Sequence, residues 1–483
     1  MEELFNKQDP IKIKLIYYLL TGPSRYREKS DIEKLFNLSS YSVETRIKEL
    51  NAELVQVQVT KEKCKIIEIE KGYQVVGNIG DIVSRLLWFY GKKARSFILL
   101  DMIVQSKKFS MKKYSEKIFL EVSSTYKIKK ELKTFLQLYQ VDLKPKYQLS
   151  GEEHAVRQLL FSIYFTIFKT FEWPFPDYIH VEADQLFRQV VMDHQVELKE
   201  MAEGDKQKIF CFLGVIVIRM NRGAFLQENN PCFSPLQHST RTVEFFQRKF
   251  KLSEAIASVE YQSIEQFLKL EQIIGSRSST LNEGALEAVQ AMADDFLRYL
   301  HRSKVGFKNK ESAEQTNEGL LFVFEKVLLY STQRIDSLFY LRKNQVSAHY
   351  PTQFQICKTF LENYFSKKEG CERTLIENHS LLLSLLSLLD EVLEYSHVHY
   401  EVKVRLDFSL GTDYQREILN LMNHKLNLPI LLSSTKEDPV DILLTDRNEK
   451  TSDKKNIVTF SYPPTTSDWT NLSELILKVL FRQ

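Results

Sequence analysis

The chain has 483 residues, of which 43% are hydrophobic and 27% are charged, and this composition predicts a soluble protein of several domains. Its longest apolar runs, residues 209–218 and 381–389, are too short to span a membrane, and the acidic start "MEELFNKQDP" is unlike a signal peptide. The five cysteines form no CxxC pair, which argues against a zinc ribbon or a disulfide framework and indicates a cytoplasmic protein.

Positive charge is concentrated in one part of the chain. Residues 1–81 hold 13 Lys and Arg against 13 Asp and Glu, whereas residues 82–150 hold 15 against 5. The remaining residues hold 38 against 45, which leaves a formal net charge of +3. Such asymmetry is typical of a protein whose basic end meets a polyanion.

A short pattern near the N-terminus occurs twice. "EKLFNLSSYSVETRIKEL" (33–50) has a counterpart in "EKIFLEVSSTYKIKKELKTF" (116–135). In the first copy the pattern predicts a helix over 30–36, a turn, and a second helix from about residue 40. The alternating residues 55–76 predict a β-hairpin with a Lys-rich tip, and together these elements predict a winged helix-turn-helix. The second helix has an apolar stripe at helical spacing, formed by Val43, Ile47, Leu50 and Leu54.

The second copy contains the same parts in the same order. "SMKKYSEKIF" (110–119) predicts its first helix, and "VDLKPKYQLSG" (141–151) predicts a short wing. Between them a second helix has a stripe at the same spacing, formed by Ile128, Leu132, Phe135 and Tyr139.

The side of each second helix opposite the stripe carries polar side chains, as a helix that enters the major groove requires. We expect nucleic-acid contacts from Tyr41, Ser42, Thr45, Arg46 and Lys48 in the first copy, with Lys61 and Lys63 at the wing tip. In the second copy we expect them from Tyr126, Lys127, Lys129, Lys130 and Lys133. The charge difference suggests that the second copy provides most of the attraction for phosphates, so reversing the charges of Lys130 and Lys133 should abolish binding.

The middle of the chain is helical in pattern. A loop near 275–280 separates two helical blocks of similar size. The predicted helices are 152–171, 183–203, 206–222, 252–273, 281–301, 311–330, 353–366 and 372–396. This region has no phosphate-binding glycine loop, no HExxH and no metal-spaced Cys/His set, so we expect no cofactor, no metal site and no enzymatic activity. Its histidines are the reactive groups that remain.

The last part of the chain predicts a small α/β domain. Residues 402–408 alternate like a strand, a helix follows, and further apolar runs precede an amphipathic last helix. The loop after the first strand, "SLGTD" (409–413), would lie at the edge of the sheet where ligands bind, and it contains neither Cys nor His.

This order of elements resembles the Mga/AtxA group of virulence regulators from Gram-positive bacteria. The resemblance covers nearly the whole chain and implies a multidomain, mainly α protein. Its domains would be two winged helix-turn-helix domains (1–80 and 81–150), two bundles similar to phosphotransferase-system regulation domains (151–277 and 278–398) and a domain similar to a sugar-transporter IIB subunit (399–483). IIB subunits carry a phosphorylated Cys in their first loop, and "SLGTD" departs from that pattern.

The resemblance also implies a function. It predicts a DNA-binding transcriptional regulator that forms a homodimer or higher oligomer and is controlled by phosphorylation of bundle histidines by phosphotransferase-system phosphocarrier proteins. The candidate phosphoryl acceptors are His194, His349 and His379. Two alternatives stay open. One is an RNA-binding antiterminator with the same kind of regulation domains, and the other is a component of sugar phosphotransfer.

Overall fold

The computed structural model describes most of the chain, and the structural statements below concern the described residues. These are residues 2–57, 64–79, 81–106, 108–169, 171–194, 201–230, 232–233, 240–271, 273–274, 281–302, 306–307, 310–329, 351–365, 379–394, 402–409, 411–426, 430–433, 440–446, 456–461 and 464–480.

The chain divides into two compact units. One is formed by Met1–Ala288 with Leu328–Ser337, and the other by Val289–Val327 with Leu338–Gln483. Helices predominate, and a four-stranded sheet lies near the C-terminus. The predicted fold class, multidomain and mainly α with a small α/β region at the end, is confirmed. No helix within the described ranges is long and apolar enough to cross a bilayer.

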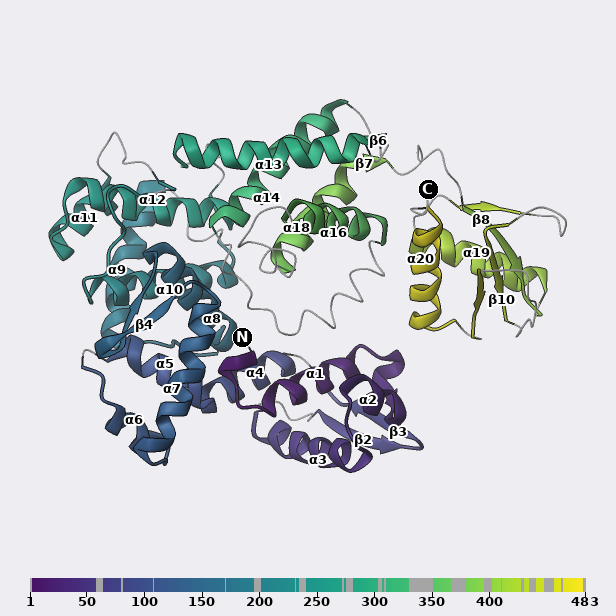
Figure 1. Cartoon of the computed structure of the whole chain (residues 1–483), viewed down its shortest axis with the longest axis horizontal. Helices are drawn as coiled ribbons and strands as arrows, with labels where there is room; N and C mark the ends of the chain where they lie inside the picture. The colour runs from purple at the N-terminus through teal and green to yellow at the C-terminus, as the bar shows by residue number, and fades with distance from the viewer. Residues whose placement is uncertain are drawn as a thin grey trace. The chain divides into compact units, whose positions relative to one another are not determined.

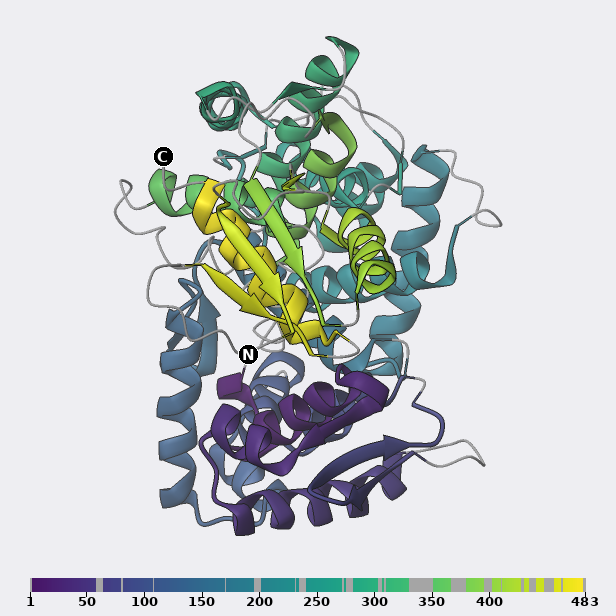
Figure 2. The ribbon, with the colours of Figure 1, turned by 90° about the vertical axis from the view of Figure 1, so that its right-hand side faces the viewer.

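The first unit begins with a winged helix-turn-helix (Figure 1). Its helices are α1 (Asp9–Leu20), α2 (Lys29–Phe36) and α3 (Ser40–Val57), and its strands are β1 (Tyr26–Glu28), β2 (Lys65–Ile69) and β3 (Gly72–Val76). The strands form an antiparallel sheet in the order β1-β3-β2. Ser39 caps α3, because its Oγ accepts a hydrogen bond from Ser42 N at 3.2 Å. In both ribbon views α3 lies at the rim of this domain (Figures 1 and 2).

The apolar stripe of α3 is confirmed, whereas the predicted hairpin over 55–76 was wrong at residues 55–57, which belong to α3. The four predicted stripe residues are at most 5% exposed. α3 continues to the buried Val57, because an apolar side chain there extends the same stripe by one turn. The wing turns at residues 70–71, so Lys65 lies at the start of β2, opposite Val76, and not at a tip.

The second copy follows in the same unit. After α4 (Ile82–Lys93) come α5 (Arg95–Gln105), α6 (Met111–Lys117) and α7 (Val122–Gln137), and then a hairpin of β4 (Asp142–Lys144) and β5 (Gln148–Ser150). The predicted helices, turn and short wing are confirmed. Ile128, Leu132 and Phe135 lie on α7 and are at most 8% exposed, which confirms the stripe at these positions. Tyr139 is buried too, but it lies two residues after the end of α7. The repeated element is larger than predicted, because α1 and α5 precede the two helix-turn-helix pairs.

Glu53 of α3 holds the two copies together. Lys12 Nζ lies 2.8 Å from its Oε1, and Tyr90 Oη of α4 donates to its Oε2 at 2.5 Å. Burial lowers the pKa of Lys12, but hydrogen bonds to Glu53 and Glu49 outweigh this effect, and the net pKa is raised. Lys12 therefore stays charged beside α3. Through their contacts with Glu53, Lys12 fixes α1 against α3, and Tyr90 fixes α4 against it.

α8 (Glu153–Phe168) starts directly after the second wing and packs against α4. The two helices approach closely at Gly91, where an added Cβ would lie 2.5 Å from Ile167 Cγ2. A side chain at this position would therefore push α4 and α8 apart.

We expect Gly91→Ala to destabilise the first unit by about 1–3 kcal/mol through overpacking, although alanine is intrinsically the better helix former by roughly 1 kcal/mol. Thermal unfolding followed by circular dichroism would measure the change. Gly204→Ala is the matched control, since a Cβ there would meet no atom within 4 Å. A Gly91→Ala protein that melts at or above the wild-type temperature would contradict the close packing.

α8 belongs to a helical bundle with α9 (Asp177–His194), α10 (Glu203–Met220), α11 (Arg241–Phe250) and α12 (Glu254–Leu270). The predictions for α8, α10 and α12 are confirmed, and α9 begins earlier than the predicted residue 183. α11 was not predicted, because its ten residues are too few to show helical periodicity clearly between two loops.

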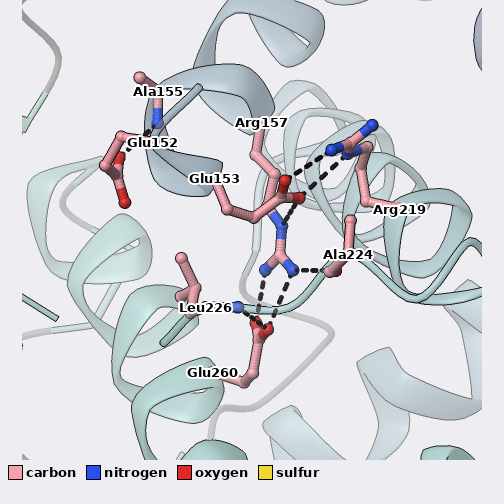
Figure 3. Close-up of polar contacts among 8 residues, drawn as sticks. All are labelled: Glu152, Glu153, Ala155, Arg157, Arg219, Ala224, Leu226 and Glu260. Carbon is pink, nitrogen blue, oxygen red and sulfur yellow. Dashed lines mark hydrogen bonds and ion pairs between the residues drawn. The ribbon is translucent and has the colours of Figure 1, made fainter. Parts of the chain in front are cut away.

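A buried ionic contact attaches α8 to α12 (Figure 3). Arg157 and Glu260 are at most 1% exposed. Arg157 Nη2 donates to Glu260 Oε1 at 2.9 Å and to Ala224 O at 3.0 Å, while Nη1 contacts Glu260 Oε2. Glu260 Oε1 also accepts from Leu226 N at 2.8 Å. Both charges are thus saturated by hydrogen bonds, as buried charges must be.

Glu153 extends this network to α10. Its Oε1 accepts from Arg157 Nε at 2.9 Å and from Arg219 Nε at 3.0 Å, and its Oε2 accepts from Arg219 Nη2 at 2.6 Å (Figure 3). Burial raises the pKa of Glu153, but the two guanidinium groups outweigh burial and lower it overall. Three helices therefore meet at one set of paired charges.

The following helices are α13 (Glu283–Arg302), α14 (Lys310–Leu329), α16 (Pro351–Phe365) and α18 (His379–Val392). They agree with the predicted helices at 281–301, 311–330 and 353–366 and with the later part of 372–396. Strand β6 (Gly306–Phe307), between α13 and α14, pairs antiparallel with β7 (Leu393–Glu394), which directly follows α18.

The C-terminal region is a small α/β domain. Its elements are β8 (Val402–Asp407), α19 (Thr412–Leu426), β9 (Ile430–Leu432), β10 (Ile442–Thr445), β11 (Ile457–Thr459) and α20 (Thr466–Leu480). The strands pair in parallel in the order β11-β10-β8-β9, which confirms the predicted small α/β domain. Within the loop after β8, Ser409 N donates to Asp446 Oδ1 at 2.9 Å.

Candidate nucleic-acid interface

The outer side of α3 carries the residues predicted to contact nucleic acid in the first copy. Tyr41 is 78% exposed. Thr45 Oγ1 donates to Tyr41 O at 2.9 Å, and Arg46 Nη1 donates to Ser42 O at 3.1 Å, so both side chains lie back along their own helix. Lys48 is exposed and has no ion-pair partner among the described residues. The first copy therefore presents one ring, two hydroxyls, one ammonium and the guanidinium of Arg46, which lies along its own helix.

Two of the other charges near α3 form a pair. Glu44, on the same helix, pairs with Lys29 of α2, and this hydrogen bond lowers the pKa of Glu44. Lys61 and Lys63 lie outside the described residues, and Lys65 is exposed at the start of β2. The first copy thus shows little net positive charge along α3.

α7 presents a more basic surface. Tyr126 is 54% exposed, and Lys127 and Lys130 are exposed without an ion-pair partner in the described part of the chain. Because the buried stripes of α3 and α7 are 85 residues apart, these two lysines occupy the helix positions of Ser42 and Thr45. The second copy therefore places ammonium groups where the first has hydroxyls.

Two other predicted lysines of α7 lie against their own wing. Lys129 Nζ sits 4.6 Å from the centre of the Tyr147 ring, which is a cation–π contact. Lys133 Nζ lies 3.3 Å from Asp142 Oδ1. These side chains hold the wing beside the helix, so they are less free than Lys127 and Lys130 to reach a phosphate.

The wing itself adds charges that the sequence analysis did not select. Lys144 and Lys146 are exposed at the turn between β4 and β5, and Lys112 and Lys113 are exposed on α6. The signal was present in the "LKPK" of the predicted wing. We call Lys127, Lys130, Lys144 and Lys146 the helix-and-wing surface.

Of the candidate phosphoryl acceptors, only His194 has a described side chain. It is half-buried at the end of α9, its Nε2 lies 3.1 Å from Tyr261 Oη, and the two rings stack with centroids 5.8 Å apart. Burial lowers the pKa of His194, which favours the neutral imidazole that a phosphoryl acceptor requires. His349 lies outside the described residues, and the side chain of His379, the first residue of α18, does as well.

A carboxyl group joins the second copy to α8. Asp101 of α5 accepts a hydrogen bond from Tyr164 Oη at 2.9 Å and another from Gln105 Nε2. Burial raises the pKa of Asp101 to about 6, from an ordinary value of 3.8. Folding therefore favours the protonated acid, and stability falls as the pH rises from about 4 to about 6.

Asp101→Asn is expected to remove this pH dependence. Two pKa units correspond to roughly 3 kcal/mol, so relative to wild type the variant should gain up to about that amount between pH 4.5 and pH 7.5. Melting temperatures of the two proteins at both pH values would measure the gain. An equal difference between the proteins at both pH values would contradict the role of the buried acid.

The comparisons with known proteins point to the same part of the chain. Residues 81–164 match the family model of the Mga helix-turn-helix domain. The match begins just before α4, includes α5, α6, α7 and the second wing, and ends within α8. It thus covers the copy that carries the helix-and-wing surface.

A curated relative supports this match. Over 300 residues the chain is 19% identical to the capsule synthesis positive regulator AcpA of Bacillus anthracis. Both findings support the resemblance to the Mga/AtxA-like family. The resemblance deduced from the repeated helix-turn-helix is therefore confirmed. The aligned region covers 61% of this Mga-like chain and 55% of AcpA, so the chain spans little more than half the length of that relative.

Proposed function

We propose that this Mga-like chain is a transcriptional regulator that binds duplex DNA through its two winged helix-turn-helix copies. The observation that carries the proposal is the exposed helix-and-wing surface within the matched Mga helix-turn-helix domain. Lysines beside a groove-sized helix attract phosphates and set the position of the protein on a duplex. The relative AcpA is named a positive regulator, which is consistent with a role in transcription and not in catalysis.

The two copies would divide the work. In the second copy, Lys127 and Lys130 flank the exposed Tyr126 near the start of α7, and the wing supplies Lys144 and Lys146. In the first copy, the hydroxyls and ring of α3 can contact base edges or sugars but add little charge. The second copy would therefore supply affinity, and the first would contribute to register or sequence preference.

Fluorescence anisotropy tests the proposal. The full chain is titrated into a labelled DNA duplex, an RNA hairpin and single-stranded DNA at several salt concentrations. We expect the chain to prefer the duplex. The slope of log affinity against log salt should be about −4 or steeper, since the four lysines of the helix-and-wing surface each replace about one counterion. Preference for the RNA hairpin would favour the antiterminator alternative and overturn the proposal.

The remaining parts of the chain would regulate this activity. We assign the winged domains to 1–80 and 81–150, the regulatory bundles to 151–277 and 278–398, and the IIB-like domain to 399–483. Phosphorylation of a bundle histidine by a phosphotransferase-system phosphocarrier would adjust DNA binding in a cytoplasmic homodimer or higher oligomer. We favour His194 as the acceptor, because burial lowers the pKa of its imidazole and it is the last residue of α9.

Incubating the chain with purified phosphocarrier protein and labelled phosphoenolpyruvate would test that assignment. Labelling that disappears in His194→Ala supports His194, and labelling that persists there but disappears in His379→Ala moves the site to α18. Onward transfer of the label to a sugar would instead support a phosphotransfer enzyme.

A further inference from the structure

A cavity of about 330 Å³ lies in the first unit, next to the Mga helix-turn-helix domain. It is formed by the end of α8, the connection from α8 to α9, and the first turns of α9 and α10. Its volume is at the lower end of the range for small-molecule pockets, about 300–1,000 Å³. The cavity is separate from the helix-and-wing surface.

Flat rings form one side of this cavity. The His180 and Phe210 rings stack with centroids 5.6 Å apart at 23°, and the Trp173 ring stands edge-on to His180 at 4.9 Å and 80°. Trp173 is held in place from behind by α10, because an added Cβ at Gly214 would lie 2.8 Å from its Cη2. A planar ligand could therefore pack against fixed aromatic surfaces.

Two buried polar atoms among the lining residues lack partners. Trp173 Nε1 and Gln207 Oε1 have no hydrogen-bond partner among the described residues. Buried polar groups in native proteins are nearly always paired, so such atoms in a cavity wall are candidates for pairing with a bound molecule. One is a donor and the other an acceptor, which suits a ligand with polar atoms in or on its ring.

An anionic ligand could pair with a lysine in the wall of this cavity. Lys169 and Lys206 line it, and Lys206 is half-buried with only a weak 3.5 Å contact to the exposed Glu203. Glu172 and Glu203 also line it; the carboxylate of Glu172 is already paired with Lys92 at 2.8 Å, and Glu203 is exposed. The ammonium of Lys206 is therefore the charge most available to a ligand.

We propose that this cavity binds a small aromatic or heteroaromatic carboxylate. The ring lies against Trp173 and Phe210, and the carboxylate pairs with Lys206. The same connection that lines the cavity is docked on the Mga domain: Gln105 Nε2 of α5 donates to Pro174 O at 2.8 Å, and Glu172 pairs with Lys92 of α4. A ligand at this place would thus act on the contact between the bundle and the second copy.

Ligand-observed saturation-transfer NMR on the full chain tests the site, with quinoline-2-carboxylate as the probe. Two compounds separate the contributions: quinoline has the ring without the carboxylate, and cyclohexanecarboxylate has the carboxylate without the aromatic ring. We expect saturable binding of the probe and binding at least about 10-fold weaker for both of the other compounds, since each loses one class of contact.

Variants locate the binding. Lys206→Gln and Phe210→Ala should each weaken probe binding at least about 10-fold, whereas Arg248→Gln, which removes an exposed cation from α11 of the same bundle, should leave it unchanged. Lys206→Gln changes a partly exposed side chain and is expected to fold, which keeps the test valid if Phe210→Ala does not. Absence of saturable binding, or unchanged binding in Lys206→Gln, would overturn the proposal. Because no DNA is present, such a failure would not bear on the proposed DNA binding.

Discussion

Reversing the charges of Lys127 and Lys130 is expected to weaken binding of the chain to duplex DNA on the order of 100-fold at about 0.1 M salt. Both ammonium groups are exposed near the start of α7 and have no ion-pair partner among the described residues. The K127E/K130E variant loses two phosphate contacts and gains two repulsions. The slope of log affinity against log salt should also decrease in magnitude by about 2 or more. Anisotropy titrations across a salt series would measure both quantities.

Two controls make this prediction specific. R248E/K251E introduces the same change in net charge on exposed side chains of the helical bundle, and we expect it to leave binding within a factor of about 3. Lys48→Glu alters the first copy, and we expect a loss of about 10-fold or less, since one phosphate contact is at stake there. If Lys48→Glu weakens binding more than K127E/K130E does, then the first copy, and not the second, supplies most of the affinity.

The structure changes the choice of lysines for this experiment. The sequence singled out Lys130 and Lys133, but Lys133 lies 3.3 Å from Asp142. Its replacement would disturb the wing as well as the charge, so a loss of binding would have two explanations. Lys127 avoids this ambiguity.

Removing the carboxylate of Glu260 is expected to destabilise the first unit by about 3–5 kcal/mol, because Glu260→Ala leaves the guanidinium of Arg157 buried without its main partner. Leu226 N would lose its acceptor as well. Thermal unfolding of the full chain, followed by a probe in the first unit, would show a large decrease in its melting temperature.

The double variant R157M/E260M distinguishes an ionic contact from simple packing. Since replacing both members of a buried pair is often close to neutral, the double variant should be less destabilised than Glu260→Ala. If the double variant loses as much stability as Arg157→Met and Glu260→Met lose together, a direct interaction is contradicted. Acid should also weaken the network: Glu153 has a lowered pKa, so its contribution is present above its ordinary value of 4.5 and is lost as the pH falls below it.

Helical periodicity was enough to predict the second helix of each copy, α3 and α7. All eight predicted stripe residues are buried, seven of them on α3 and α7 and Tyr139 just beyond α7, because tertiary packing requires one apolar side at this spacing. The first wing was predicted to begin too early because the last residues of α3 also fit the pattern of a strand. Alternation in "VQVQV" is typical of a strand, yet Val57 also continues the helical stripe, and burial of that side chain favours the helix.

Other features depend on contacts between residues far apart in the chain. Nothing local to Lys12 or Tyr90 indicates that both would meet Glu53, and the pair of Arg157 with Glu260 spans 103 residues. The free or paired state of each lysine on α7 likewise depends on where the wing lies. Sequence could therefore predict which helix carries the candidate site, but not which of its side chains are available.

Photocrosslinking tests the central claim most directly. A photoreactive phenylalanine analogue is placed at position 126, near the start of α7, or at position 138, just after its end, where Leu138 is 45% exposed. The account predicts a covalent adduct with duplex DNA from position 126 that is several times more abundant than from position 138. Equal yields from both positions, or an adduct only from position 138, would show that the start of α7 does not enter a groove. Either result would contradict the account.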